Sequence, residues 1–143
     1  MIIRNAKVND SEAIKDLCEN ELEYQTDLSL VKSQLSFITS HSDQQIIIVA
    51  EDNNLVVGFV HAQLYITLYS APSLNILGLA VSKKYQKQGI GKTLMAKIES
   101  LALKNDIHQI RLNSGVERIS AHRFYESVGY IHNKDQARYG KII

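Results

Sequence analysis

The segment from Gln86 to Lys92, QKQGIGK, limits the possible folds of this chain more than any other part of the sequence. It lies between an apolar stretch, Leu74 to Val81, and an amphipathic stretch, Leu94 to Leu103. A strand, a glycine turn and a helix in this order leave the first N–H groups of the helix without partners, and the helix dipole adds positive charge there. Glycine has no Cβ, so an anion can approach its backbone closely. The segment therefore predicts a site for a cofactor that carries a pyrophosphate.

Three phosphate-binding patterns compete for this segment. The P-loop pattern GxxxxGK[ST] is half present as Gly91-Lys92-Thr93, but its first glycine would fall at Gln86. The dinucleotide pattern GxGxxG begins at Gly89 but meets Leu94 where its last glycine is needed. The pattern [QR]xxGx[GA] matches from Gln86 to Gly91 at every position. In this match the segment resembles the acetyl-CoA pyrophosphate loop of the GNAT superfamily of N-acetyltransferases.

Two features beside the loop agree with this resemblance. Leu79-Ala80-Val81 precedes the loop at the spacing seen in GNAT proteins, and no acidic residue lies from Ser82 to Ile98. The lysines that cluster around the loop are Lys83, Lys84, Lys87, Lys92 and Lys97. Lysines at an anion site attract a polyphosphate by long-range Coulomb forces, although a solvated surface also explains part of such a cluster.

A second segment, Ser120 to Tyr130, resembles the other GNAT signature, AxxFYxxxG[FY]. Ala121 and Phe124 fall on one face of an expected helix, and Gly129 is suited to end it. The resemblance places Tyr125 at the position that, in the family, protonates the departing CoA thiolate. A phenol, with an ordinary pKa of about 10, can supply that proton if it reaches the sulfur. Without the resemblance, the sequence indicates only that Tyr125 is an ordinary residue of an amphipathic helix.

The pattern of apolar residues predicts one α/β domain over residues 1–143. Strands are expected over residues 1–6, 45–51, 55–65, 74–81 and 107–112, with a last pair around 130–132 and 137–142. Helices are expected around residues 14–22, 28–38, 89–104 and 119–128. The order βααβββαβαββ resembles the GNAT fold over nearly the whole chain. That fold implies a twisted mixed sheet of about six or seven strands, with helices on both faces and a gap between its central parallel strands.

Composition excludes several other classes of protein. The chain has 143 residues, 45% of them apolar, and one proline, which is typical of a folded domain. A net charge of +1 provides no basic field for nucleic acid. Cys18 is the single cysteine, and no histidines share a metal-ligand spacing, so we expect neither a disulfide nor a metal site. No signal peptide or membrane-spanning run is recognisable, so we expect a cytoplasmic protein.

The resemblance implies direct transfer of an acetyl group from acetyl-CoA to a primary amine, either of a small molecule or of a peptide. Loop N–H groups would hold the pyrophosphate, and strand backbone would pair with the pantetheine arm. A backbone N–H near Leu79 or Ala80 would polarise the thioester carbonyl. In place of an asparagine common in the family the chain has Arg118, so Asn113 is the expected substitute in holding the cofactor arm. The implied acetyl-CoA contacts are Leu79, Ala80, Val81, Gln86, Lys87, Gln88, Gly89, Ile90, Gly91, Lys92 and Asn113.

The general base departs from the family pattern. Many GNAT enzymes carry a glutamate six residues before the position of Val81, where this chain has Asn75, which cannot accept a proton at neutral pH. A water chain, Glu51, His61 and His122 all remain possible bases. The alternative function is therefore a non-catalytic module that binds or senses acyl-CoA.

Two features concern the acceptor. Acidic residues concentrate between Glu19 and Asp27, where they could attract a cationic amine or simply form a solvated helix face. The segment from Tyr65 to Pro72 is unusually apolar for a loop, and could line an acceptor pocket or form a homodimer contact. The acceptor, the acyl-chain preference and the oligomeric state stay open at this point.

Overall fold

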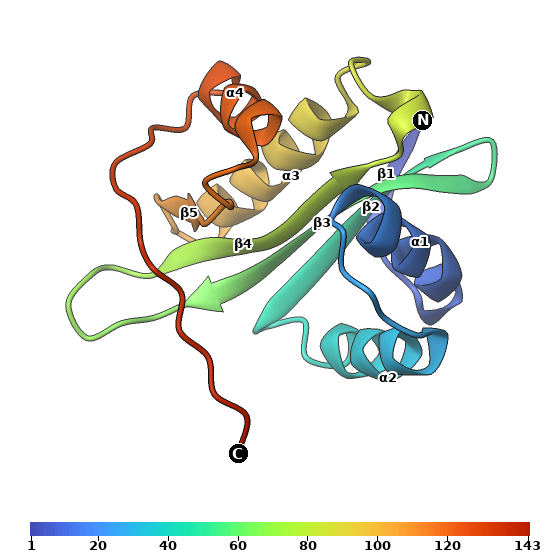
Figure 1. Ribbon diagram of the computed structural model, residues 1–143, viewed down its shortest axis with the longest axis horizontal. Helices are drawn as coiled ribbons and strands as arrows, with labels where there is room; N and C mark the ends of the chain where they lie inside the picture. Colours follow the sequence, from blue (N-terminus) through green and yellow to red (C-terminus); the bar gives the residue numbers. More distant parts are fainter. The chain divides into compact units, whose positions relative to one another are not determined.

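Five strands form one sheet, in the order β1-β2-β3-β4-β5, in the computed structural model of this chain, which describes residues 1–143 (Figure 1). The strands are β1 (Ile2–Asn5), β2 (Gln45–Asp52), β3 (Leu55–Tyr65), β4 (Ser73–Val81) and β5 (Ile110–Leu112). The helices are α1 (Ser11–Glu21), α2 (Leu28–Thr39), α3 (Ile90–Lys104) and α4 (Ile119–Ser127), with short 3-10 helices at Val8–Asp10 and Lys83–Tyr85. The chain divides into two compact units: Met1–Leu112 holds the sheet and α1 to α3, and Asn113–Ile143 holds α4.

The sheet is mixed. β1 to β4 pair antiparallel with their neighbours, whereas β5 pairs parallel with β4. Parallel neighbours need a crossover connection, and α3 provides it. Asn53 and Asn54 form the two-residue turn between β2 and β3, with positive φ of 49° and 64° that asparagine tolerates better than most residues. The predicted α/β fold with a mixed sheet is confirmed.

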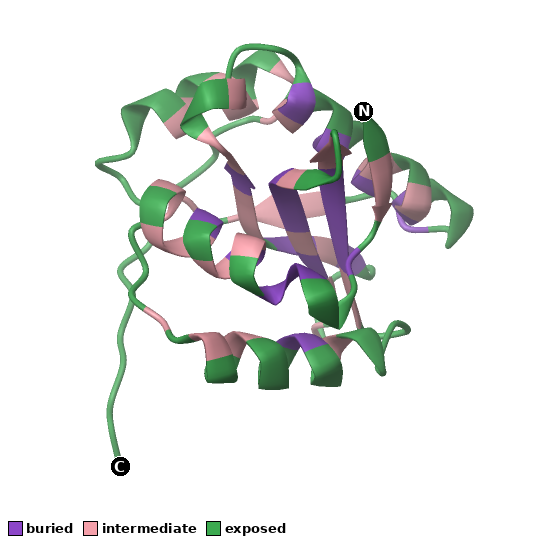
Figure 2. Ribbon diagram, turned by 90° about the vertical axis from the view of Figure 1, so that its right-hand side faces the viewer, coloured by how far each residue is buried: buried purple, intermediate pink, exposed green.

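Helices cover both faces of the sheet. α1 and α2 lie on one face and α3 lies on the other (Figures 1 and 2). Ile14, Leu17 and Leu35 form a buried cluster with Val49 and Phe59 of the sheet. The largest side chains that α3 buries completely are Leu94, Met95 and Ile98. Burial of one such side chain stabilises the fold by about 1.5–3 kcal/mol, so both helical layers are held mainly by apolar contact. None of the helices combines the length and the apolar character needed to cross a bilayer.

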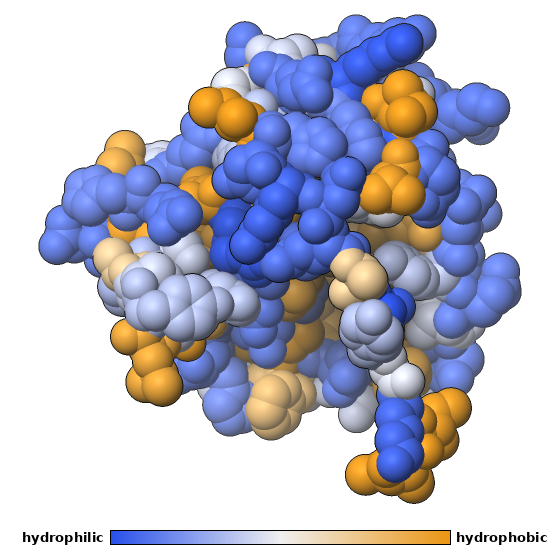
Figure 3. Space-filling view, turned by 60° about the vertical axis from the view of Figure 1, so that its left-hand side comes forward, coloured by the Kyte–Doolittle hydropathy of each residue, from blue (hydrophilic) through white to orange (hydrophobic).

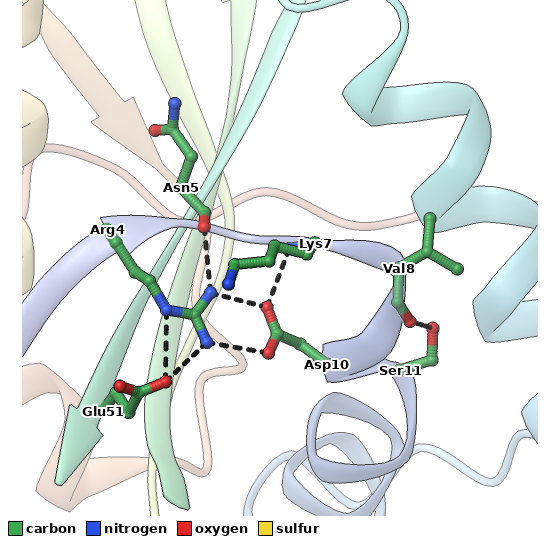
Figure 4. Close-up of polar contacts among 7 residues, drawn as sticks. All are labelled: Arg4, Asn5, Lys7, Val8, Asp10, Ser11 and Glu51. Carbon is green, nitrogen blue, oxygen red and sulfur yellow. Dashed lines mark hydrogen bonds and ion pairs between the residues drawn. The ribbon is translucent and has the colours of Figure 1, made fainter. Parts of the chain in front are cut away.

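An ion-pair network joins β1 and β2 to the start of α1 (Figure 4). The two terminal nitrogens of Arg4 donate to Asp10 at 2.9 Å each, and Glu51 accepts from Arg4 at 2.8 and 3.3 Å. Asp10 also accepts the backbone N–H of Lys7 at 2.7 Å. Burial alone would raise the pKa of Asp10, but the bonds from Arg4 and Lys7 outweigh it and hold that pKa below the ordinary 3.8. The network therefore holds the edge strand β1 to β2 and to the start of α1 through ionised side chains.

The predicted last pair of strands is wrong. Residues 130–143 form no helix or strand, so the sheet has five strands and the order ends βα instead of βαββ. A polar run, Asn133 to Gln136, interrupts the expected alternation, and a hairpin is marginal on its own in water. β5 is also shorter than predicted, because Ile107 still closes α3 by donating its N–H to Ala102 at 2.9 Å.

Candidate functional site

The predicted phosphate loop joins β4 to α3, and its backbone is left-handed at Lys87, with φ 62°, and at Gly89, with φ 81°. α3 begins at Ile90, whose buried side chain anchors the first turn in the core. Thr93 is the first residue whose N–H bonds back along the helix, to the carbonyl of Gly89 at 3.0 Å. The N–H groups of residues 90–92 therefore have no acceptor within the helix and stand at the positive end of its dipole.

Gly89 meets two requirements of this turn. Its left-handed backbone would cost another residue about 1–2 kcal/mol. No atom lies within 4 Å of the position where a Cβ would stand, so the space in front of the turn is open. Successive N–H groups around left-handed residues form concave sites that suit anions. The turn is therefore shaped to accept a phosphate group.

Positive side chains surround the loop, and one carboxylate reaches it. Exposed lysines stand at positions 83, 84, 87 and 92, and the first turn of α3 has no acidic residue. Glu21, at the end of α1, accepts the N–H of Lys83 at 3.0 Å and the side-chain amide of Gln86 at 3.1 Å. The sequence prediction missed this contact. Helical periodicity indicates that Glu21 lies on α1, but it does not identify the partner of its side chain, which lies 62 residues later in the sequence.

The edge of β4 that faces β5 is only partly paired. The parallel ladder ends at Ile76 and Leu112, whereas β4 continues to Val81. The peptide groups of Leu79 and Ala80 therefore lie beyond the last ladder pair of this edge. Peptide groups in such a position can bond an extended chain that lies along the strand. The gap between the parallel strands stays a prediction, because β5 itself ends at Leu112.

Asn75, which replaces the family glutamate, is part of a side-chain network across three strands. Its Nδ2 donates to Oε1 of Gln63 at 3.0 Å, and its Oδ1 accepts from Arg111 at 2.8 Å. The guanidinium of Arg111 lies over the ring of Tyr65, 4.5 Å from the centroid. Asn75 is buried, and both ends of its amide are engaged. The residue at this position therefore orients a cation instead of accepting a proton.

The three side chains considered as bases each have a structural partner. Glu51 belongs to the ion-pair network of Figure 4. His61 lies 2.7 Å from Oε1 of Gln45, and burial lowers its pKa to about 4. His122 lies 2.8 Å from the carbonyl of Gly115. A base acts best when its pKa is near the working pH, so His61 is a poor acceptor for an ammonium proton at pH 7. These contacts favour none of the three.

Tyr125 lies in the second unit, on α4, and is partly buried. Burial raises the pKa of its phenol, and the cation of Arg118 opposes that shift. The phenol therefore carries its proton at neutral pH and can donate it, as the predicted role requires. Arg118 is the N-cap of α4 but makes no capping bond with its side chain. Asn113, the predicted substitute for the family asparagine whose position Arg118 occupies, is exposed and directly follows β5.

The predicted site residues fall into two groups. Those from Leu79 to Lys92 form one stretch of the first unit, which runs along β4, through the loop and into the first turn of α3. Tyr125 and Asn113 belong to the second unit. The first group presents strand peptide groups and helix N–H groups in succession. Such a succession suits a ligand that carries an amide chain and a pyrophosphate.

Several of the clustered carboxylates have partners within the first unit. Glu19 forms an ion pair with Lys15 at 2.6 Å. Asp27 caps α2 by accepting the N–H of Leu30 at 2.9 Å. These contacts give both residues a structural role in α1 and α2, and attraction of a cationic acceptor stays a prediction.

The loop between β3 and β4 carries exposed apolar side chains. Leu68 and Tyr69 are 106% and 86% exposed. On the face drawn in Figure 3, orange apolar groups are separated by blue hydrophilic ones. Both predicted roles of this loop, lining an acceptor pocket or contacting a second copy, stay predictions.

Comparison with protein families yields one clear match. A family model described as an acetyltransferase (GNAT) domain matches residues 43–132. The matched segment includes both motifs identified in the sequence, the loop of Gln86 to Gly91 and the helix of Tyr125. A search of curated proteins finds no match.

Solved structures of acetyltransferases share this fold at low sequence identity. An aminoglycoside 6'-N-acetyltransferase from Acinetobacter haemolyticus has a TM-score of 0.81 at 14% identity, covering 100% of this chain and 99% of that chain. The aminoglycoside N-acetyltransferase AAC(6')-Iy, solved in complex with CoA, has a TM-score of 0.85 at 16% identity, covering 98% and 93%. A GNAT family acetyltransferase from Staphylococcus aureus has a TM-score of 0.78 at 24% identity, covering 98% of each chain.

Proposed function

Since this chain belongs to the GNAT family of acetyltransferases and is an acyltransferase, we propose that it moves an acetyl group from acetyl-CoA to a primary amine. The observation that carries the proposal is the succession of peptide groups from Leu79 on the open edge of β4 to Lys92 in the first turn of α3. The family match covers residues 43–132 and so crosses from the first unit into the second. That extent supports one acetyltransferase domain over residues 1–143.

Each part of acetyl-CoA has a chemical counterpart in these residues. The N–H groups from Gln88 to Lys92 hold the pyrophosphate, and the exposed lysines attract it. The backbone of Leu79 to Val81 pairs with the amides of the pantetheine arm. A peptide N–H at Leu79 or Ala80 stabilises the negative charge that develops on the thioester oxygen, which typically contributes a few kcal/mol. The neighbour solved with CoA supports this choice of co-substrate.

The reaction is direct attack of the amine nitrogen on the thioester carbonyl carbon. The C–S bond breaks as the C–N bond forms, and the phenol of Tyr125 gives its proton to the departing sulfur. The amine loses a proton to water or to a side chain, which balances the proton gained by sulfur. Holding both reactants side by side supplies much of the rate, because the entropy of bringing them together is lost on binding.

The acceptor is a small-molecule amine or a peptide amine. Two of the three structural neighbours described above are named for aminoglycosides, which makes amino sugars one class to test. A homodimer and a cytoplasmic location stay predictions from the sequence.

The test is release of free CoA thiol from acetyl-CoA with a panel of amines: polyamines, aminoglycosides, amino acids, and peptides with a free lysine or N-terminus. Tyr125→Phe should lower kcat at least tenfold and leave the Kd of acetyl-CoA nearly unchanged, since only the transferable proton is lost. Tyr139→Phe is the matched control, because Tyr139 is 92% exposed. Full turnover by Tyr125→Phe would show that another group is the acid.

The alternative function, a non-catalytic acyl-CoA-binding module, is favoured by one observation. Asn75 holds Arg111 and Gln63 at the position where many family members have glutamate. Acetyl-CoA binding by calorimetry, without thiol release for any amine in the panel, would favour the module over the enzyme.

A further inference from the structure

Glu21 ties the end of α1 to the start of the cofactor loop. One of its oxygens accepts the backbone N–H of Lys83 at 3.0 Å, and the other accepts Nε2 of Gln86 at 3.1 Å. The same Nε2 donates to the carbonyl of Val81 at 2.9 Å. The amide of Gln86 is therefore held between α1 on one side and the end of β4 on the other.

The loop has few other means of holding its shape. At its start, Ser82 donates its N–H to the carbonyl of Val57 on β3 at 2.8 Å, and the loop's other bonds are local, such as Tyr85 N–H to the Ser82 carbonyl at 2.8 Å. Residues 86–89 are exposed, so little apolar burial fixes them. Lys87 nevertheless adopts φ 62°, a conformation that is unfavourable for a residue with a Cβ. A loop of this kind samples other conformations unless contacts from outside hold it.

The end of α1 is a firm support for such contacts. Leu22, directly after Glu21, packs against β4: a Cβ built on Gly78 would lie 3.5 Å from Cδ1 of Leu22. The buried residues Ile14 and Leu17 fix the rest of α1 to the sheet. Glu21 therefore projects from a part of the chain that is itself anchored next to β4.

We propose that Glu21 is a positioning residue for acetyl-CoA, which holds the loop in the conformation that presents its N–H groups to the pyrophosphate. This inference rests on the proposed function. It adds a requirement for tight cofactor binding that lies outside the loop motif, at the end of α1 and within the acidic segment from Glu19 to Asp27. A ligand that meets a loop already in shape loses less entropy on binding, so its affinity is higher.

The sign of the effect separates positioning from simple charge. Glu21 is negative, and its carboxylate stands beside a site for an anion. By Coulomb repulsion alone, removing it would tighten CoA binding. If Glu21 instead holds the loop, removing it weakens CoA binding. The two explanations therefore predict opposite changes in Kd.

The experiment is calorimetric titration of the full chain with CoA, together with kcat and KM for acetyl-CoA. Glu21→Ala should raise Kd and KM about tenfold, equivalent to about 1.4 kcal/mol, and leave kcat within about twofold. Glu21→Gln keeps one side-chain oxygen as an acceptor and should recover part of the affinity. Asp16→Ala removes the same charge from an exposed position of α1 and should leave Kd unchanged or slightly lower.

Far-UV circular dichroism and thermal unfolding test whether each variant is folded. If Glu21→Ala is not folded, the comparison is made with Glu21→Gln. Unchanged or tighter CoA binding by a folded Glu21 variant, with normal binding by the natural chain, would overturn the inference and leave the proposed function intact. A natural chain that binds no CoA would overturn the proposed function itself.

Discussion

The backbone N–H of Tyr130 donates to the carbonyl of Tyr125 at 2.9 Å, and the two rings meet edge to face with their centroids 6.1 Å apart. Between them, the N–H of Gly129 donates to Glu126 at 3.1 Å, and Gly129 has φ 97°. Together these bonds form a Schellman motif with its usual apolar contact. The glycine and the aromatic residue that end the second sequence motif therefore close the helix that carries Tyr125.

Gly129→Ala should lower the free energy of unfolding by about 1–2 kcal/mol, because alanine must adopt the same left-handed backbone. No neighbouring atom lies within 4 Å of the new Cβ, so a clash adds nothing. Urea unfolding measures the change. Gly140→Ala is the control, since a Cβ there also meets open space and its backbone is not left-handed. An equal loss in both variants would exclude the backbone conformation as the cause.

Stability should depend on His61 in weakly acidic solution. Burial lowers its pKa from 6.5 to about 4, so the unfolded chain binds the proton more tightly than the folded one. The contribution of neutral His61 is therefore complete above pH 6.5 and is lost as the pH falls toward 4, amounting to about 3 kcal/mol at most. His61→Gln should flatten the unfolding free energy over this range. An unchanged slope in that variant would assign the pH dependence to other groups.

Asp10→Asn should destabilise the chain by about 2–3 kcal/mol at pH 7, because the part-buried guanidinium of Arg4 loses one of its two charged partners and keeps only Glu51. The pKa of Asp10 is lowered in the folded chain, so its contribution is present above the ordinary value of 3.8 and lost as the pH falls below it. Urea midpoints of the variant and the natural chain should therefore converge in strong acid. Asp16→Asn, on the exposed side of α1, should have little effect at any pH.

Restoring the family glutamate at position 75 should not by itself raise kcat. The guanidinium of Arg111, which donates to Asn75 at 2.8 Å, would pair with the new carboxylate and lower its pKa. A carboxylate with a lowered pKa is a weaker base at neutral pH. The pH–rate profiles of Asn75→Glu and of Asn75→Glu with Arg111→Gln provide the measurement. A new apparent pKa near neutrality in the single variant would contradict this pairing.

Local signals explain which features the sequence predicts well. The glycine spacing of the loop, the Asn53-Asn54 turn and the apolar runs of β3 and β4 each depend on neighbouring residues alone. The contacts of Asn75 with Arg111 and of Glu21 with the loop depend instead on how distant segments pack. The last two predicted strands failed for a related reason, since a strand requires a partner that its own residues do not specify.

The open edge of β4 has a consequence for how such a protein can change over time. Peptide groups are the same whatever side chain they carry, so substitutions from Leu77 to Val81 leave the donors and acceptors of that edge in place. Under the proposed function, cofactor recognition through peptide groups would tolerate wide divergence, because side chains elsewhere could change to fit another acceptor amine without removing those contacts. The fold itself is shared by acetyltransferases that are 14–24% identical to this chain.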